Sequence, residues 1–293
     1  MTAVPKARRQ QSLPFSACVI GSPVKHSLSP VIFSHWFEQT GLNKRHSYEA
    51  LEVESADLMP QITSFQEDMN FRGFNVTIPH KQTVMNFCKH VDAMAERIGA
   101  VNAVTFDTRR NLYGVNTDAY GFIEGVRHTV PHIAFSKRPA LILGAGGAAR
   151  AVLEGLLAEG TPEITLCNRT LDKAATWART CSQPDKVKVL NWKERNKAVE
   201  DCSLLVNTTS LGMEGQEPLD LSLKKIKTST VVCDIVYSPL VTPLLANAEK
   251  QNCRTVNGLG MLVHQAHKAF QIWFGVLPDI TPELWQKLEA AQK

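Results

Sequence analysis

The chain has 293 residues, of which 44% are hydrophobic and 20% charged, a composition typical of globular proteins. This length predicts about two domains, and the longest apolar runs are too short to span a bilayer. The formal net charge of +4 is spread along the sequence without a basic block, which argues against a nucleic-acid surface and fits an anionic small ligand. The seven cysteines form no Cys-x-x-Cys pair, so neither a disulfide framework nor a zinc site is indicated.

The first segment, residues 1–16, is basic but has neither an apolar core nor a small-residue cleavage site. We therefore predict a disordered leader without an export signal, and a cytoplasmic protein. Beyond it, apolar strand segments alternate with helical patterns, which is typical of α/β folds with mainly parallel sheets.

Two series of strands are predicted, and a polar segment at 131–139 separates them. The strands of the first series lie near 17–21, 48–53, 72–78 and 101–107. The strands of the second series lie at 140–144, 163–167, 186–190, 203–207 and 231–236. Two helices without a further strand, at 261–275 and 281–293, close the chain.

The stretch VKHSLSP at 24–30 places two serines between a strand and a helix. Ser29 precedes Pro30, so we expect its hydroxyl to cap the helix that follows. Ser27 has no such role, and residues two apart in an extended segment point to the same side. Two hydroxyls beside a helix N-terminus would suit a carboxylate, because the N–H groups and the helix dipole favour negative charge there. A plain cap without a ligand is the alternative interpretation.

The stretch ALILGAGGAARAVLEGLL, from residue 140, is a buried strand, a glycine-rich turn and a helix. Gly144, Gly146 and Ala149 have the spacing of a dinucleotide fingerprint. The next strand ends at Asn168 and Arg169, where an NAD-binding unit usually has an acidic residue. Because a guanidinium can bind a 2′-phosphate with two parallel hydrogen bonds, the pattern favours NADP over NAD. An arginine in a solvated turn is the alternative.

Candidate acid/base residues occur in the first series of strands. GFNVTIPHKQTV, from residue 73, ends a strand and puts Lys81 at the start of a helix. A cation there faces the positive end of the helix dipole, and this unfavourable placement suits a lysine that must give up its proton. The alternative is a solvated surface lysine, which is what most lysines are. VNAV and GVNTDAYGF place Asn102, Asn116 and Asp118 at strand ends or helix starts. Taken alone, Asp118 fits an N-cap better than a catalytic role.

Together these motifs resemble a known family. HSLSP, NVTIPHK, GAVN, NTD, GAGGAAR, NRT, NTTSLGM, DIVYSP and GLGMLVHQ occur in this order at spacings that closely resemble shikimate dehydrogenase, from about residue 17 to the final helices. The resemblance implies an oxidoreductase that reduces 3-dehydroshikimate to shikimate with NADPH, in the pathway to chorismate and the aromatic amino acids. It also implies two α/β domains, with the active site in the cleft between them. The expected parts are a substrate domain at 17–118, a Rossmann-like NADP-binding domain at 119–257, and C-terminal helices at 258–293 that return to the substrate domain.

Residue by residue, the resemblance implies a complete site. Lys81 and Asp118 match the catalytic lysine and its paired carboxylate, which together would exchange a proton with the C3 oxygen. The residues that match substrate contacts are Ser27 and Ser29 at the carboxylate, and Thr77, Asn102, Tyr237 and Gln265. The residues that match NADP contacts are Gly144, Ala145, Gly146, Gly147 and Ala148 at the pyrophosphate, Asn168, Arg169, Thr170 and Lys173 at the adenosine phosphate, and Ile235, Gly258 and Met261 near the nicotinamide. No metal is expected, because His35, His264 and His267 lack a cluster of further ligands.

Two alternatives stay open. One is a quinate/shikimate dehydrogenase with relaxed cofactor use, and the other is a catalytically silent NADP-binding regulatory protein on the same fold. The serine pair at 27 and 29 and the Asn-Arg pair at 168 and 169 favour shikimate and NADP, while Lys81 and Asp118 favour turnover. As partners we expect a small-molecule substrate, with neither nucleic acid nor membrane, and the sequence leaves a homodimer open.

Overall fold

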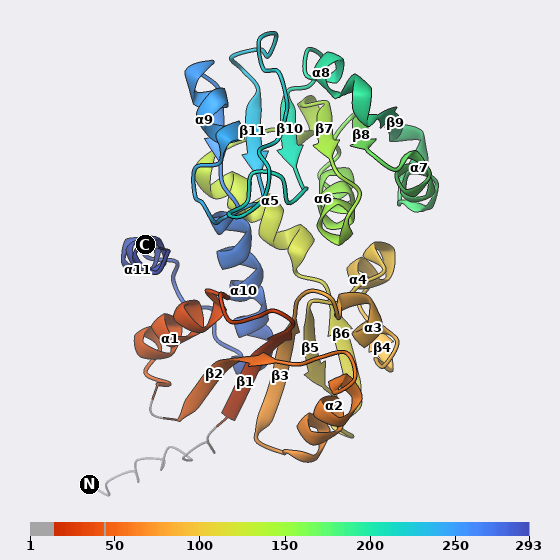
Figure 1. Cartoon of the computed structure of the whole chain (residues 1–293). Helices are drawn as coiled ribbons and strands as arrows, with labels where there is room; N and C mark the ends of the chain where they lie inside the picture. Colours follow the sequence, from red (N-terminus) through yellow and green to blue (C-terminus); the bar gives the residue numbers. More distant parts are fainter. Residues whose placement is uncertain (1–14, 44, 293) are drawn as a thin grey trace, which may run out of the picture.

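The computed structural model describes residues 15–43 and 45–292, which form two six-stranded sheets covered by helices (Figure 1). The first sheet has the order β2-β1-β3-β5-β6-β4. Its strands are β1 (Phe15–Gly21), β2 (His46–Glu52), β3 (Phe71–Val76), β4 (His90–Val91), β5 (Ala103–Phe106) and β6 (Leu112–Val115). Strands β1, β2 and β3 are parallel, whereas β5 is antiparallel to both of its neighbours.

Helices pack on both faces of this first sheet. They are α1 (Ser29–Gln39), α2 (Leu58–Glu67), α3 (Lys81–Met85) and α4 (Ala93–Ile98). Alternate residues of β1 point to opposite faces, as in any strand: Ala17 and Val19 join the core under α1, whereas Cys18 and Ile20 join the core under α2. Because both faces are covered, the strand is apolar throughout, and this is the continuous run that the sequence shows.

The second sheet has the order β12-β11-β10-β7-β8-β9, and all of its pairings are parallel. Its strands are β7 (Ala140–Leu143), β8 (Ile164–Asn168), β9 (Val187–Asn191), β10 (Leu204–Asn207), β11 (Val231–Asp234) and β12 (Arg254–Val256). Its helices are α5 (Asp118–Thr129), α6 (Gly147–Ala158), α7 (Leu171–Thr180), α8 (Arg195–Ala198) and α9 (Pro243–Lys250). Numbered from β7, this order is the 3-2-1-4-5-6 arrangement of dinucleotide-binding folds, which changes direction between β7 and β10.

The last helices, α10 (Leu259–Phe274) and α11 (Pro282–Ala290), return to the first sheet. Phe270 and Trp273 pack in the core under α1, and the Trp273 indole N–H donates to the Val104 carbonyl at 3.0 Å. Helix α10 also lies along α5, and the two backbones touch: a Cβ on Gly125 would lie 2.7 Å from the carbonyl carbon of Gly260. The predicted fold, including the return of the C-terminal helices, is confirmed.

Some boundaries differ from the predicted ones. Strands β4, β6 and β12 were not predicted, because these short segments carry too little apolar periodicity of their own. Strand β1 begins at Phe15, and residues 1–14 of the predicted leader lie outside the described residues. Within the described ranges, no helix combines the length and apolar character that crossing a membrane requires.

Candidate active site

The candidate site lies where the carboxyl ends of the second sheet's strands face the first sheet (Figure 1). Parallel sheets bind ligands at the carboxyl ends of their strands, at the point where the strand order reverses. The loop after β3 leads into α3, and the loop after β6 leads into α5. These two helix starts carry the first pair of predicted site residues, Lys81 and Asp118.

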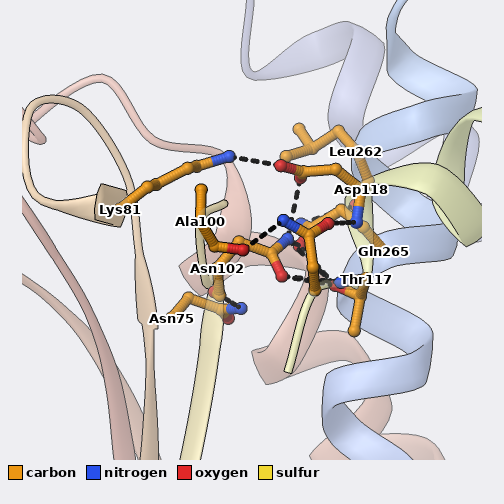
Figure 2. Close-up of polar contacts among 9 residues, drawn as sticks. Asn75, Lys81, Ala100, Asn102, Thr117, Asp118, Leu262 and Gln265 are labelled. Carbon is orange, nitrogen blue, oxygen red and sulfur yellow. Dashed lines mark hydrogen bonds and ion pairs between the residues drawn. The ribbon is translucent and has the colours of Figure 1, made fainter. Parts of the chain in front are cut away.

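Lys81 and Asp118 form a close ion pair, with 2.6 Å between Nζ and Oδ2 (Figure 2). The lysine side chain is 29% exposed and the aspartate side chain 9%, so the ammonium group is the accessible partner. The interpretation of Asp118 as an N-cap is wrong. Its carboxylate caps nothing, and its own backbone N–H donates to the Asn116 Oδ1 at 3.0 Å. The amide of Asn116 therefore does the capping and leaves both oxygens of Asp118 for other partners.

Asn102 holds the second oxygen of Asp118 (Figure 2). Its Nδ2 donates to Asp118 Oδ1 at 2.7 Å and lies 3.3 Å from Gln265 Oε1, while its Oδ1 accepts the Thr117 N–H at 2.7 Å. All four side chains are buried. The structure thus brings together Asn102 and Asp118 from one part of the chain and Gln265 from α10, more than 140 residues away.

Asn75 is a buried member of this cluster that the sequence analysis missed. It stands at the end of β3, where its Nδ2 donates to the backbone carbonyl of Asn102 at 3.0 Å and its Oδ1 accepts the hydroxyl of Tyr48 at 2.7 Å. An available signal was the amide itself, because an asparagine within the apolar run GFNV must find buried partners. The partner Tyr48 could not be inferred without the order of the strands.

The serine pair is arranged differently from the prediction. Ser29 is the first residue of α1, and the cap position belongs to Leu28, without a side-chain cap. The prediction that the Ser29 hydroxyl caps the helix is therefore wrong. Instead, Ser27 Oγ accepts the backbone N–H of Ser29 at 3.3 Å, and Ser29 itself is buried. The Ser27 hydroxyl oxygen therefore takes up an N–H at the helix end, the role that was expected of the Ser29 hydroxyl.

Thr77 and Tyr237 each follow a strand, one in the first sheet and the other in the second. Thr77 directly follows β3, and its side chain packs so closely on Gly21 that a Cβ there would lie 2.3 Å from the threonine methyl. Tyr237 follows β11 and is half-buried, and this burial raises the pKa of its hydroxyl. Both therefore keep a neutral hydroxyl available for a polar ligand near neutral pH.

The glycine-rich turn after β7 leaves room for a phosphate group. Gly144 has a φ of 106°, which favours glycine, and a Cβ there would lie 2.8 Å from Thr208 Oγ1. In contrast, nothing lies within 4 Å of a Cβ placed on Gly146 or Gly147, so the start of the 12-residue helix α6 is open. Ala145 and Ala148 complete the turn without adding bulk. A pyrophosphate fits this place, because free helix N–H groups and the dipole bind anions.

The turn after β8 presents basic side chains to solvent. Asn168 Nδ2 donates to the Thr170 carbonyl at 2.8 Å and shapes the turn, so that the intervening Arg169 is exposed. Lys173 is exposed one turn into α7, with its Nζ 5.6 Å from the centre of the Trp177 ring. No carboxylate within the described ranges forms an ion pair with either cation. Both therefore suit an anionic group such as a 2′-phosphate.

The three residues predicted near the nicotinamide line one small cavity. Ile235, Gly258 and Met261 share it with Phe122 of α5. Gly258 is required there, since a Cβ would lie 2.0 Å from the Ile235 carbonyl oxygen. The lining is largely apolar, which suits a flat ring.

The three histidines that the sequence analysis rejected as metal ligands, His35, His264 and His267, are buried or half-buried. Burial is the main cause that lowers the pKa of His264, from 6.5 to about 4, and the nearby charge of His128 adds to it. Its Nε2 is buried without a hydrogen-bond partner. Across the part of the chain that the structure describes, no three His, Cys, Asp or Glu side chains gather as a metal ion would need.

Known protein families match almost the entire described chain. The shikimate dehydrogenase substrate binding domain matches residues 19–104, the shikimate / quinate 5-dehydrogenase family matches 127–261, and the shikimate 5'-dehydrogenase C-terminal domain matches 258–282. A curated relative named shikimate dehydrogenase (NADP(+)), from Paramagnetospirillum magneticum, is 47% identical over 92% of this chain and 95% of its own length. The chain belongs to the shikimate dehydrogenase family.

Solved structures of shikimate dehydrogenases have the same fold. The Listeria monocytogenes enzyme in complex with shikimate and NAD has a TM-score of 0.85 and 30% identity, covering 97% of this chain and 99% of that one. The Thermus thermophilus enzyme in complex with NADP(H) and shikimate has a TM-score of 0.80 and 33% identity, covering 95% and 98%. The predicted family and fold are therefore confirmed, and this shikimate dehydrogenase homologue has its polar cluster where the two sheets meet.

Proposed function

We propose that this chain interconverts 3-dehydroshikimate and shikimate with NADP(H), and that Lys81 and Asp118 move the proton. The observation that carries the proposal is the 2.6 Å contact between Lys81 Nζ and Asp118 Oδ2. It puts an accessible ammonium group on a fixed, buried carboxylate at the carboxyl ends of the strands. Such a pair can give a proton to a carbonyl oxygen and take it back.

In this mechanism the bound NADPH supplies the hydride. Lys81 donates a proton to the C3 oxygen as negative charge develops there, and it accepts that proton in the reverse reaction. Asp118 holds the ammonium group in place through the 2.6 Å contact. Because Asn102 holds the other carboxylate oxygen at 2.7 Å, Asp118 cannot turn away from Lys81. The pair is thus positioned before substrate arrives, which reduces reorganisation during the reaction.

The substrate would lie between the serine pair and this ion pair. Ser27 and Ser29 would bind its carboxylate, while Thr77, Asn102 and Gln265 would bind the ring hydroxyls. Tyr237 would add a contact from the second sheet. The buried side-chain amides of Asn102 and Gln265 support this role. An analogue without the ring hydroxyls would leave buried polar groups of the site unpaired, so it would be disfavoured.

The cofactor would lie along the second sheet. Residues 144–148 and the start of α6 would hold the pyrophosphate, and Ile235, Gly258 and Met261 would contact the nicotinamide. Asn168 and Thr170 would shape the turn at the adenosine phosphate, where Arg169 and Lys173 supply positive charge. Lysine keeps the charge but lacks the two-pronged geometry of arginine, so Arg169 would be the main determinant of NADP preference.

Oxidation of shikimate by the purified protein tests this function directly. Reduced nicotinamide is followed by absorbance with shikimate or quinate, each with NADP or NAD. We expect growth of the signal with shikimate and NADP, and much less in the other three combinations. A higher kcat/KM for quinate with NAD would instead support the quinate/shikimate alternative. Silence in all four combinations, with NADPH still bound, would support the regulatory one.

Three further predictions stay proposals. We propose domain bounds at 17–118, 119–257 and 258–293, which limited proteolysis would test. A cytoplasmic location is supported by the seven free thiols, because disulfides are rare in reducing compartments. A homodimer would be tested by light scattering of the purified protein.

A further inference from the structure

Asp234 is a buried carboxylate that the proposed mechanism does not use. It is the last residue of β11 and is 1% exposed. Among the described residues, no lysine, arginine or histidine forms an ion pair with it. Burying a carboxylate without a cation is costly unless neutral donors satisfy its oxygens. The donors that Asp234 gathers therefore indicate which parts of the chain it holds together.

Three neutral donors from three segments surround the carboxylate. Thr242 Oγ1 donates to Asp234 Oδ2 at 2.7 Å, while Asn207 Nδ2 and the Val236 backbone N–H donate to Oδ1, each at 3.1 Å. Burial raises the pKa of Asp234, and the donors from Thr242, Val236 and Asn207 oppose that rise. One side chain thus joins the end of β10, the turn after β11 and the start of α9.

The carboxylate fastens the loop between β11 and α9 at both of its ends (Figure 1). Val236 lies near the start of this loop. Thr242 ends it as the N-cap of α9, and its Oγ1 also accepts the Leu245 N–H at 3.4 Å. Between these two attachments lies Tyr237, the proposed substrate contact, and just before them lies Ile235, the proposed nicotinamide contact. The segment that carries both contacts is therefore held by one side chain.

The backbone of Val236 also contacts a further part of the proposed cofactor site. Its N–H donates to Asp234, and its carbonyl accepts the Gly258 N–H at 3.0 Å. Gly258 lines the same small cavity as Ile235, whose own N–H donates to the Asn207 carbonyl at 3.1 Å. A shift of Val236 would therefore disturb both Ile235 and Gly258.

We propose that Asp234 is a positioning residue that holds Ile235 at the nicotinamide and Tyr237 at the substrate by fastening their loop, an inference that rests on the proposed function. Its oxygens are taken up by protein donors, so Asp234 acts through the loop and not on the reacting atoms. The adenosine end of the cofactor should not depend on it. Arg169 follows β8, and two strands, β10 and β7, separate β8 from β11.

The substitution Asp234→Ala removes all three attachments, and two ligands separate a local effect from a general one. NADPH would occupy the whole proposed cofactor site, whereas adenosine 2′,5′-bisphosphate carries the 2′-phosphate but no nicotinamide. We expect Kd for NADPH and KM for shikimate to rise by about 10-fold or more, the usual effect of losing hydrogen bonds to a charged group, and kcat to fall. Kd for the bisphosphate should stay that of the wild type. Asp201→Ala is the matched control, since Asp201 is an exposed aspartate just before β10 of the same sheet, and it should change neither Kd.

Asp234→Asn tests whether the attachments or the charge matter. Its amide oxygen should face Asn207 Nδ2 and the Val236 N–H, because an amide nitrogen there would meet two donors. The Thr242 hydroxyl can turn and accept from the amide nitrogen. This variant therefore keeps the three attachments, and it should bind NADPH and shikimate nearly as well as the wild type. An Asp234→Asn variant as impaired as Asp234→Ala would overturn the proposal.

Two results with Asp234→Ala would also overturn the positioning role. One is a wild-type Kd for NADPH and KM for shikimate, and the other is an equal rise in Kd for NADPH and for the bisphosphate, which would indicate a general defect. A wild-type protein that binds NADPH but does not oxidise shikimate would overturn the proposed function, while the two Kd values would still test Asp234.

Thr242→Val provides the test if Asp234→Ala does not fold. It deletes one attachment at nearly constant side-chain size, so Kd for NADPH should rise and Kd for the bisphosphate should not. Thr242→Ser keeps the hydroxyl and should match the wild type. An unchanged Kd for NADPH in Thr242→Val would show that the loop does not depend on its attachment to Asp234.

Discussion

Replacing Lys81 by alanine removes the proton donor from the ion pair and leaves the fold in place. Lys81 is the first residue of a five-residue helix, its side chain is 29% exposed, and it is not one of the buried core residues. Asp118 keeps its bond to Asn102 at 2.7 Å and does not lose its position. The variant should therefore fold and bind NADPH like the wild type, and the defect should lie in the chemical step.

The size of that defect follows from the role of the residue. A positioned general acid contributes about 10²- to 10⁴-fold in rate, which corresponds to about 2.7 to 5.4 kcal/mol of activation free energy. We expect Lys81→Ala to lower kcat by this factor, with little change in KM for NADP. Initial rates of NADP reduction by shikimate measure kcat, and quenching of protein fluorescence by NADPH measures cofactor binding.

Lys89→Ala is the matched control, because Lys89 is an exposed lysine a few residues beyond the same helix. It should have the kcat of the wild type. If Lys81→Ala lost less than about 5-fold in kcat, far below the effect of a general acid, Lys81 would have no place in proton transfer. A loss of NADPH binding equal to the loss of kcat would show a folding defect in place of a chemical one.

Three further changes probe the cofactor site and stability. Arg169→Ala should raise KM for NADP by about 10-fold or more, because a charge-assisted contact is worth about 1.5 to 3 kcal/mol. It should leave KM for NAD unchanged. Equal effects on both cofactors would show that the guanidinium does not bind the 2′-phosphate. Gly258→Ala would place a Cβ 2.0 Å from the Ile235 carbonyl oxygen, and should cost about 1–3 kcal/mol in urea unfolding; an unchanged midpoint would contradict this contact. For His264 the pKa falls from 6.5 unfolded to about 4 folded, so stability should decline as pH is lowered from about 6.5 toward 4, since only the unfolded chain then binds the proton. His264→Leu should flatten the decline in Tm over that window, and an identical decline would show that another group is responsible.

Local signals in the sequence were sufficient to predict the glycine turn after β7 and the basic turn after β8, whereas Ile235, Gly258 and Met261 were predicted from the resemblance alone. The conformation of the glycine turn at 144–147 could be predicted from the sequence, because strand, turn and helix are consecutive in the chain. Arg169 could be located for the same reason, by counting from the fingerprint to the end of the next strand. These features depend on neighbours in sequence, and a single chain displays them directly.

In the substrate half, the pairing of residues that are far apart in the chain could be predicted only through the resemblance. Lys81 and Asp118 are 37 residues apart, and their contact depends on how β3 and β6 are placed in a mixed sheet. The partnership of Tyr48 with Asn75 requires the order β2-β1-β3, which alternation of apolar residues does not encode. Ser29 was misassigned because a serine before a proline is a common cap, whereas here the turn at Ser27 takes up the free N–H.

The close contact of α5 and α10 has a consequence for engineering. Asp118 stands at the start of α5, while Met261 and Gln265 lie one turn apart on α10, so about 6 Å along one helix separates the proposed cofactor contact from the proposed substrate contact. Since the two helices meet at Gly125 and Gly260, a bulkier residue on either helix would collide with the other. A chimera that grafts the nucleotide-binding half of a relative onto this chain should therefore take α5 and α10 from a single parent. A crossover between them would pair mismatched helix surfaces and shift the hydride donor relative to its acceptor.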